Sequence, residues 1–140
     1  MSYNGCGNAP HCSLTVNSMS GIANYLSDKT LLITGTTGFL AKGIVEKIFR
    51  QAPDIRRVYL ACIRPKRLKN GTTLSAEERM EKEIFQSSVF DRLRGIHGDW
   101  LLNILREKTV PVEGDLTLDH LGIDPDMYEQ LTKQVQVVIA

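Results

Sequence analysis

Four short apolar runs recur along the chain from residue 30 onwards, each bounded by polar or turn-forming residues. They span residues 30–34, 58–63, 109–113 and 137–139. Most positions within a run are apolar or β-branched, which is typical of a strand that is buried on both of its faces. The pattern therefore predicts four strands of a covered sheet.

The segments between these runs carry apolar residues at helical spacing. Leu40, Ile44 and Ile48 repeat every four residues, and we expect this helix to stop before Pro53. Three further helical segments are indicated by a Ser-x-x-Glu capping box, an apolar cluster and an Asp-Pro cap, and they begin at Ser75, near Trp100 and at Asp124. The apolar cluster is expected to face the core and consists of Trp100, Leu101, Leu102 and Leu105.

Strands that alternate with amphipathic helices predict an α/β fold, a Rossmann-like doubly wound parallel sheet with helices on both faces. The fourth strand is expected to lie beside the first. A complete sheet of this kind has about six strands, whereas the pattern here gives three strands and the start of a fourth. We therefore expect residues 22–140 to form the N-terminal part of a larger Rossmann-like domain, and residues 1–21 to be a flexible extension.

Composition narrows the class of protein. Of 140 residues, 42% are hydrophobic, and 17 Lys and Arg against 16 Asp and Glu give a formal charge of +1, so no strongly basic surface favours nucleic acid. No apolar run approaches the roughly 20 residues of a membrane-spanning helix. Three cysteines give no disulfide framework, which favours an intracellular location. The organelle and the oligomeric state stay open.

A glycine-rich turn separates the first strand from the first helix. Gly35 permits a tight turn, Gly38 lets the backbone approach a pyrophosphate, and Ala41 allows close packing of helix on strand. The N–H groups at the helix start then face the phosphates. A P-loop is excluded because Lys42 is followed by Gly43 rather than by Ser or Thr. The turn predicts dinucleotide binding; a purely structural turn is the alternative.

The residue after the second strand indicates which dinucleotide is bound. An NAD site places an acidic residue there for the ribose 2′-hydroxyl, whereas this chain has Arg64, whose guanidinium suits a 2′-phosphate. The sequence therefore predicts NADPH as the cofactor. The cations that follow, Lys66, Arg67 and Lys69, are interpreted as a solvated basic loop.

These residues resemble a known family. Residues 34–42 (TGTTGFLAK), 58–66 (VYLACIRPK) and 110–116 (VPVEGDL) are similar to the extended short-chain dehydrogenase/reductase superfamily, and within it to alcohol-forming fatty acyl-CoA reductases of the male-sterility type. The resemblance covers roughly residues 22–140. It implies NADPH-dependent reduction of a long-chain acyl-CoA to a fatty alcohol.

The resemblance also implies roles for individual residues. The pyrophosphate would be contacted by Gly35, Thr37, Gly38, Phe39 and Leu40. Arg64 would take the 2′-phosphate, and Asp115 with Leu116 would meet the adenine; a plain turn acid is the alternative for Asp115. The chain departs from the family pattern at Thr36, where Ala is frequent, and at Cys62, which we interpret as an inert buried thiol.

The family's catalytic Tyr-x-x-x-Lys lies beyond the fourth strand, so we expect no catalytic residue among these 140 and only the adenine and pyrophosphate half of the cofactor site. Tyr25 and Lys29 have the motif's spacing but precede the first strand. Cys6, His11 and Cys12 lack paired metal-ligand spacing, so no metal site is expected. A non-catalytic nucleotide-binding remnant and a reductase or epimerase of nucleotide sugars are the alternative functions.

Overall fold

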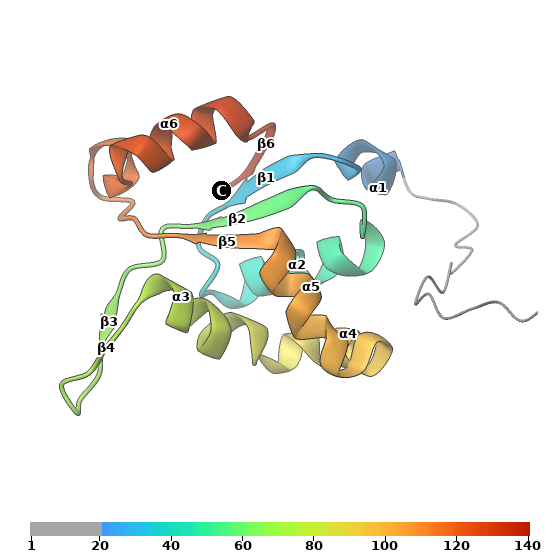
Figure 1. The fold of residues 1–140 in the computed structure, drawn as a ribbon, viewed down its shortest axis with the longest axis horizontal. Helices are drawn as coiled ribbons and strands as arrows, with labels where there is room; N and C mark the ends of the chain where they lie inside the picture. Colours follow the sequence, from blue (N-terminus) through green and yellow to red (C-terminus); the bar gives the residue numbers. More distant parts are fainter. Residues whose placement is uncertain (1–20) are drawn as a thin grey trace, which may run out of the picture.

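A computed structural model, which describes residues 21–140, arranges the four apolar runs as one parallel sheet (Figure 1). The order of its strands is β5-β2-β1-β6, and every pairing is parallel. The fourth run therefore lies beside the first, as predicted. The strands are β1 (Thr30–Ile33), β2 (Arg57–Ala61), β5 (Thr109–Val112) and β6 (Val137–Ile139).

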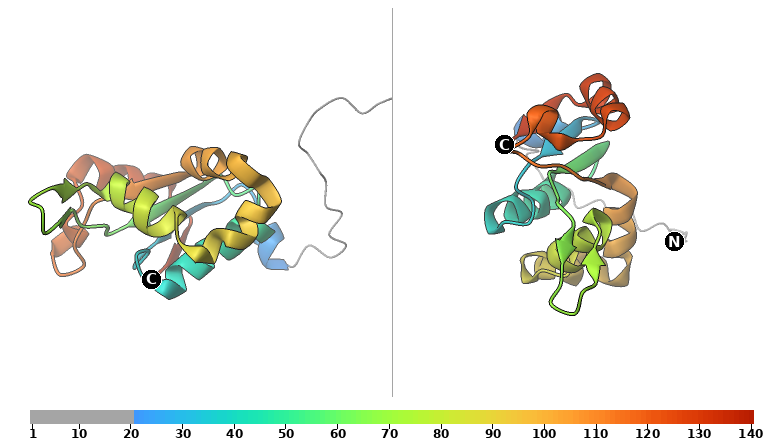
Figure 2. Two further views of the ribbon diagram at one scale, coloured as in Figure 1. Left: turned by 90° about the horizontal axis from the view of Figure 1, so that it is seen from below. Right: turned by 90° about the vertical axis from the view of Figure 1, so that its left-hand side faces the viewer.

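Helices cover both faces of the sheet, which confirms the predicted α/β class. One layer lies below the strands in Figure 1 and contains α2 to α5, while α6 lies above them; Figure 2 shows the same two layers from other sides. The helices are α1 (Gly21–Leu26), α2 (Phe39–Gln51), α3 (Ala76–Arg79), α4 (Asp91–His97), α5 (Leu101–Lys108) and α6 (Pro125–Gln134).

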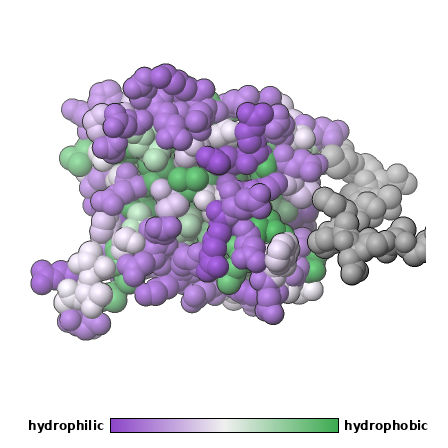
Figure 3. Space-filling view, in the orientation of Figure 1, coloured by the Kyte–Doolittle hydropathy of each residue, from purple (hydrophilic) through white to green (hydrophobic). Residues whose placement is uncertain are grey.

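Alternation along the strands divides the core into two parts. Leu31 and Ile33 of β1 pack with the helices of the larger layer, whereas Leu32 between them packs on the side of α6. All three are buried, because helices lie on both sides. Hydrophobic residues also show at the surface in the band between the two layers (Figure 3).

Helix starts follow the predicted caps. The Ser75 hydroxyl accepts a hydrogen bond from the Glu78 N–H at 3.1 Å, and the Glu78 carboxylate accepts from the Ser75 N–H at 2.9 Å. Asp124 caps α6 by accepting from the N–H groups of Asp126 and Met127. Both side-chain caps satisfy N–H groups that a helix itself leaves unpaired.

Three details of the fold differ from the sequence-based expectation. The basic segment after β2 is not a simple loop, because β3 (Lys66–Arg67) and β4 (Thr73–Leu74) pair as an antiparallel hairpin. The helix that starts with α3 continues as a π-helix over Met80–Phe85. The core assignment of Trp100 is wrong: it is 60% exposed, although Leu101 and Leu105 beside it are buried.

The expected flexible extension falls almost entirely outside the described part of the chain. It covers residues 1–20, which the structure does not describe, and Gly21, which begins α1. Within residues 21–140, none of the helices has the length and apolarity that crossing a bilayer requires.

A buried tyrosine fastens α6 to the sheet. Tyr59 of β2 is fully buried, and its hydroxyl donates to the Gln134 side-chain oxygen at 2.7 Å and accepts from the Gln130 side-chain amide at 3.2 Å. Two polar side chains of α6 are thus joined to the sheet through one phenol.

We expect Tyr59→Phe to lower the free energy of unfolding by about 1–2 kcal/mol, because the amide groups facing the removed hydroxyl are left without this partner. Urea or thermal unfolding of the purified protein measures this loss. Tyr25→Phe removes the same hydroxyl from a residue that is 61% exposed and is the matched control, with an expected change below about 0.5 kcal/mol. Equal stability of both variants would contradict the prediction.

Candidate nucleotide-binding site

The glycine turn joins the carboxyl end of β1 to the start of α2. Gly35 has a φ of +66°, a conformation that glycine adopts without the strain of a side chain. The N–H of Gly38 donates to the Gly35 carbonyl at 2.9 Å, which closes the turn. A Cβ at Gly38 would lie 3.1 Å from that carbonyl oxygen, tighter than ordinary packing. The turn is therefore tight, as the sequence predicts.

The helix start beside this turn offers hydrogen-bond donors. No side chain caps α2, so the N–H groups of its first turn have no partner from the cap residue Gly38. Thr36 is 1% exposed, and its hydroxyl is the one buried side-chain polar atom of residues 21–140 that has no hydrogen-bond partner. The uncapped N–H donors at this helix N-terminus fit an anionic group such as a pyrophosphate.

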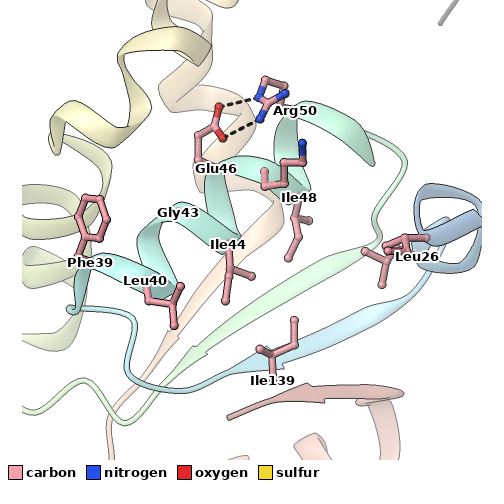
Figure 4. Close-up of a pocket in the computed structure, with 11 residues that line it drawn as sticks. Leu26, Phe39, Leu40, Gly43, Ile44, Glu46, Ile48, Arg50 and Ile139 are labelled. Carbon is pink, nitrogen blue, oxygen red and sulfur yellow. Dashed lines mark hydrogen bonds and ion pairs between the residues drawn. The ribbon is translucent and has the colours of Figure 1, made fainter. Parts of the chain in front are cut away.

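The side chains of Phe39 and Leu40 lie away from these donors. They are 82% and 76% exposed. Figure 4 shows Leu40 and Ile44 pointing from α2 towards Ile139; these residues line an apolar hollow together with Phe39, whose ring is turned away from Ile139 in this view. A ligand held at the helix start would therefore meet these two residues through their backbone. Thr37, half-buried within the turn, is the remaining predicted contact.

The carboxyl end of β2 carries Cys62 and Arg64. The φ of Cys62 is +63°, and the ladder resumes only at Ile63, whose N–H donates to the Val112 carbonyl at 3.1 Å. Cys62 is half-buried and packs against the part of the core on the side of α6, so the expectation of a fully buried thiol is wrong. Partial burial and the charge of Asp115 both raise the pKa of the Cys62 thiol, which disfavours the reactive thiolate.

The loop after β5 fixes the backbone of Asp115 by a hydrogen bond. The N–H of Asp115 donates to the Leu121 carbonyl at 2.7 Å, and His120, Leu121 and Gly122 all have left-handed backbones, with φ of 50°, 59° and 56°. Three successive left-handed residues reverse the chain within one turn. A Cβ at Gly114 would come within 2.7 Å of the same Leu121 carbonyl oxygen, so glycine is required there for reasons of space.

The structure brings Arg64 and Asp115 together, although the sequence assigned them to different parts of the cofactor. The Arg64 guanidinium donates from Nη1 to Asp115 Oδ2 at 3.0 Å. The other oxygen of Asp115 accepts from the N–H and the hydroxyl of Thr117, at 2.9 and 2.7 Å. The Thr117 N–H first, then its hydroxyl and the Arg64 charge, hold the pKa of Asp115 below its usual range. Leu116, 59% exposed, lies next to this pair in the chain.

A second set of charges fixes the backbone of Arg64. Arg79 donates to the Arg64 carbonyl at 2.6 Å and binds Glu83 through two nitrogens, at 2.7 and 3.1 Å. Glu83 also pairs with Lys66 at 3.3 Å, and the hydrogen bond from Arg79 lowers the pKa of Glu83 below the usual range. Arg79 and Glu83 were not predicted; their spacing of four residues on a helix was the available signal.

Other candidate groups lie elsewhere. Tyr25 lies in α1, and the ammonium of Lys29 is 5.9 Å from the tyrosine ring. Both residues precede β1, so they lie at its amino-terminal end, whereas the glycine turn follows its carboxyl end. Within residues 21–140, no cluster of His, Cys, Asp or Glu has the composition of a metal site. Cys6, His11 and Cys12 lie outside the described residues.

Comparison with known proteins gives one family and several relatives. Residues 33–140 match an NAD-binding family described as Male sterility protein. Fatty acyl-CoA reductase 8 of Arabidopsis thaliana is 40% identical over 118 residues, which cover 83% of this chain and 23% of that protein. The chloroplastic fatty acyl-CoA reductase 2 of the same plant is 35% identical over 119 residues, covering 85% of this chain and 18% of that protein. The chain thus spans less than a quarter of the length of these relatives.

A solved structure has a similar fold. The reductase (R) domain of a non-ribosomal peptide synthetase from Mycobacterium tuberculosis superposes with a TM-score of 0.53 at 25% identity. The alignment covers 84% of this chain and 26% of that one. The likeness agrees with a Rossmann-like parallel sheet whose first strand, glycine turn and first helix are all present here.

Proposed function

The chain belongs to the family of NAD-binding domains described as Male sterility protein, and on this premise we propose that it holds the adenosine and pyrophosphate part of NADPH in a fatty acyl-CoA reductase. The proposed substrate is a long-chain acyl-CoA, as the names of its relatives suggest. The product is the fatty alcohol that the resemblance of the sequence implies.

The glycine turn carries this proposal. The N–H groups at the start of α2 have no side-chain cap and are donors that suit an external acceptor. The positive end of the helix dipole adds to these donors, so the start of α2 suits an anionic ligand. We assign the pyrophosphate to Gly35, Thr37, Gly38, Phe39 and Leu40, where the last two contribute backbone N–H groups.

The strand ends beside the turn are assigned to the adenosine. Arg64 would bind the 2′-phosphate, and Asp115 and Leu116 would lie against the adenine. When bound, the nicotinamide dinucleotide supplies the hydride that reduces the thioester carbonyl and then the aldehyde. In this proposal the described residues bind and orient the cofactor.

We expect Arg64→Ala to reduce the affinity for NADPH by about 10- to 100-fold while the affinity for NADH stays within about two-fold. A charge-assisted contact between guanidinium and phosphate contributes about 1.5–3 kcal/mol, and NADH has no phosphate at this position. Calorimetric titration of the purified protein with each nucleotide measures the two affinities.

Arg67→Ala is the matched control, because it removes the same charge from an exposed residue of the neighbouring hairpin, three positions away. We expect it to change NADPH affinity by less than about two-fold. An unchanged preference in Arg64→Ala, or an equal loss in Arg67→Ala, would show that Arg64 does not read the 2′-phosphate.

A further inference from the structure

The partner of the Arg64 guanidinium is itself an anion. Among residues 21–140, Asp115 provides the carboxylate that ion-pairs with this guanidinium, at 3.0 Å. The Arg64 side chain is 66% exposed and that of Asp115 is 21% exposed, so the guanidinium reaches from solvent onto a partly buried acid. The cation is the more exposed member of the pair.

Asp115 is held in place independently of Arg64. Thr117 donates two hydrogen bonds to Oδ1, and the Leu121 carbonyl accepts from the Asp115 N–H. These contacts fix the carboxylate and leave Oδ2 directed to the guanidinium. Glu83, whose partner Arg79 also binds the Arg64 carbonyl, is already engaged by Arg79 and Lys66. The competition for Arg64 is therefore between Asp115 and any anionic ligand.

We propose that Asp115 is a specificity-determining residue whose carboxylate competes with the ribose 2′-phosphate for the guanidinium of Arg64. Binding of a 2′-phosphorylated nucleotide then requires Arg64 to exchange one anionic partner for another. A nucleotide without this phosphate leaves the ion pair intact. Asp115 thus lowers the preference that Arg64 alone would give. This inference rests on the proposed nucleotide site.

The exchange is governed by charge rather than by shape. Carboxylate and phosphate both accept hydrogen bonds from the planar guanidinium, and their negative charges repel each other when both lie beside it. The low pKa of Asp115 keeps its carboxylate ionised at neutral pH. An amide in place of this carboxylate retains an oxygen for Thr117 but removes the charge that holds Arg64.

The test is the Asp115→Asn variant of the full chain, titrated at neutral pH and fixed salt with 2′,5′-ADP and with 5′-AMP. We expect the ratio of the affinity for 2′,5′-ADP to that for 5′-AMP to rise about two- to five-fold, the range of an exposed ion pair, because any change in the adenine contact of Asp115 affects both nucleotides equally. In an Arg64→Ala background the same substitution is expected to leave this ratio unchanged. Circular dichroism checks that each variant is folded.

Asp119→Asn is the matched control, since it removes one negative charge from an exposed residue of the same loop. We expect it to leave both affinities unchanged; an equal gain there would attribute the effect to net charge and overturn the inference.

Two further results would overturn the inference while nucleotide binding stands. One is an unchanged ratio of the two affinities in Asp115→Asn, which would leave Asp115 an adenine contact alone, and the other is a lower ratio. Failure of the unsubstituted chain to bind either nucleotide would overturn the proposed function as well. The ratio of the two affinities thus separates the two failures.

Discussion

Gly38→Val is expected to lower the affinity for a nicotinamide dinucleotide by at least about 100-fold. The φ of −80° and ψ of 160° at Gly38 suit valine, so the substitution tests space rather than backbone strain. Apart from its chain neighbours, the added Cβ meets only the Gly35 carbonyl oxygen within 4 Å, and it takes up space beside the helix start. Displacing a pyrophosphate from two charge-assisted hydrogen bonds there costs about 3–6 kcal/mol.

Gly43→Val provides the comparison for this result. It places the same side chain in the same helix, at a position where no described atom lies within 4 Å of the added Cβ. We expect its nucleotide affinity to equal that of the unsubstituted protein. If Gly38→Val is folded by circular dichroism and still binds the dinucleotide normally, the turn is only a structural connection.

Gly114→Ala is expected to destabilise the fold by about 1–3 kcal/mol, the usual cost of forcing extra atoms into a packed site. The added Cβ would lie 2.7 Å from the Leu121 carbonyl oxygen and 3.1 Å from a carbon of Ile123. Backbone must move to accommodate it, and that backbone belongs to the left-handed turn that holds Asp115. Urea unfolding measures the loss of stability, and nucleotide titration is expected to show weaker binding in the same variant.

Gly95→Ala is the control for this substitution. Gly95 lies within α4, and a Cβ there meets no described atom within 4 Å. Alanine is the better helix former, so we expect a gain of about 0.5–1 kcal/mol in the free energy of unfolding. A Gly114→Ala protein as stable as the unsubstituted one would mean that the loop after β5 adapts freely.

The sheet could be predicted because its signals are local. Apolar runs indicated all four strands. Ser75 and Asp124 indicated two helix starts, because serine and aspartate are residue types that cap free N–H groups. The glycine turn could be predicted equally well, since the φ of +66° at Gly35 is a conformation that glycine adopts readily. Each of these features is specified by residues that are adjacent in the chain.

The features that were missed depend on contacts between distant residues or on unusual backbone. His120 and Leu121 have left-handed backbones without being glycine or asparagine, so their residue types do not predict the turn that they form. Cys62 also has a left-handed backbone, with a φ of +63°, and cysteine is not a residue type that indicates this conformation. The Arg64–Asp115 pair joins residues 51 positions apart, and it follows only from the adjacency of β2 and β5 in the sheet.

The central place of β1 has a consequence for the order in which the chain assembles. Leu31 pairs with Val58 of β2 and with Val137 of β6, so the second pairing closes a loop about four times longer than the first. Each doubling of loop length costs about 0.6 kcal/mol of chain entropy, which makes the β1–α2–β2 unit the easier one to close. The glycine turn lies inside that unit, whereas the Arg64–Asp115 pair needs β5 in place. The proposed pyrophosphate site is therefore expected to form earlier in folding than the proposed site for the ribose 2′-phosphate.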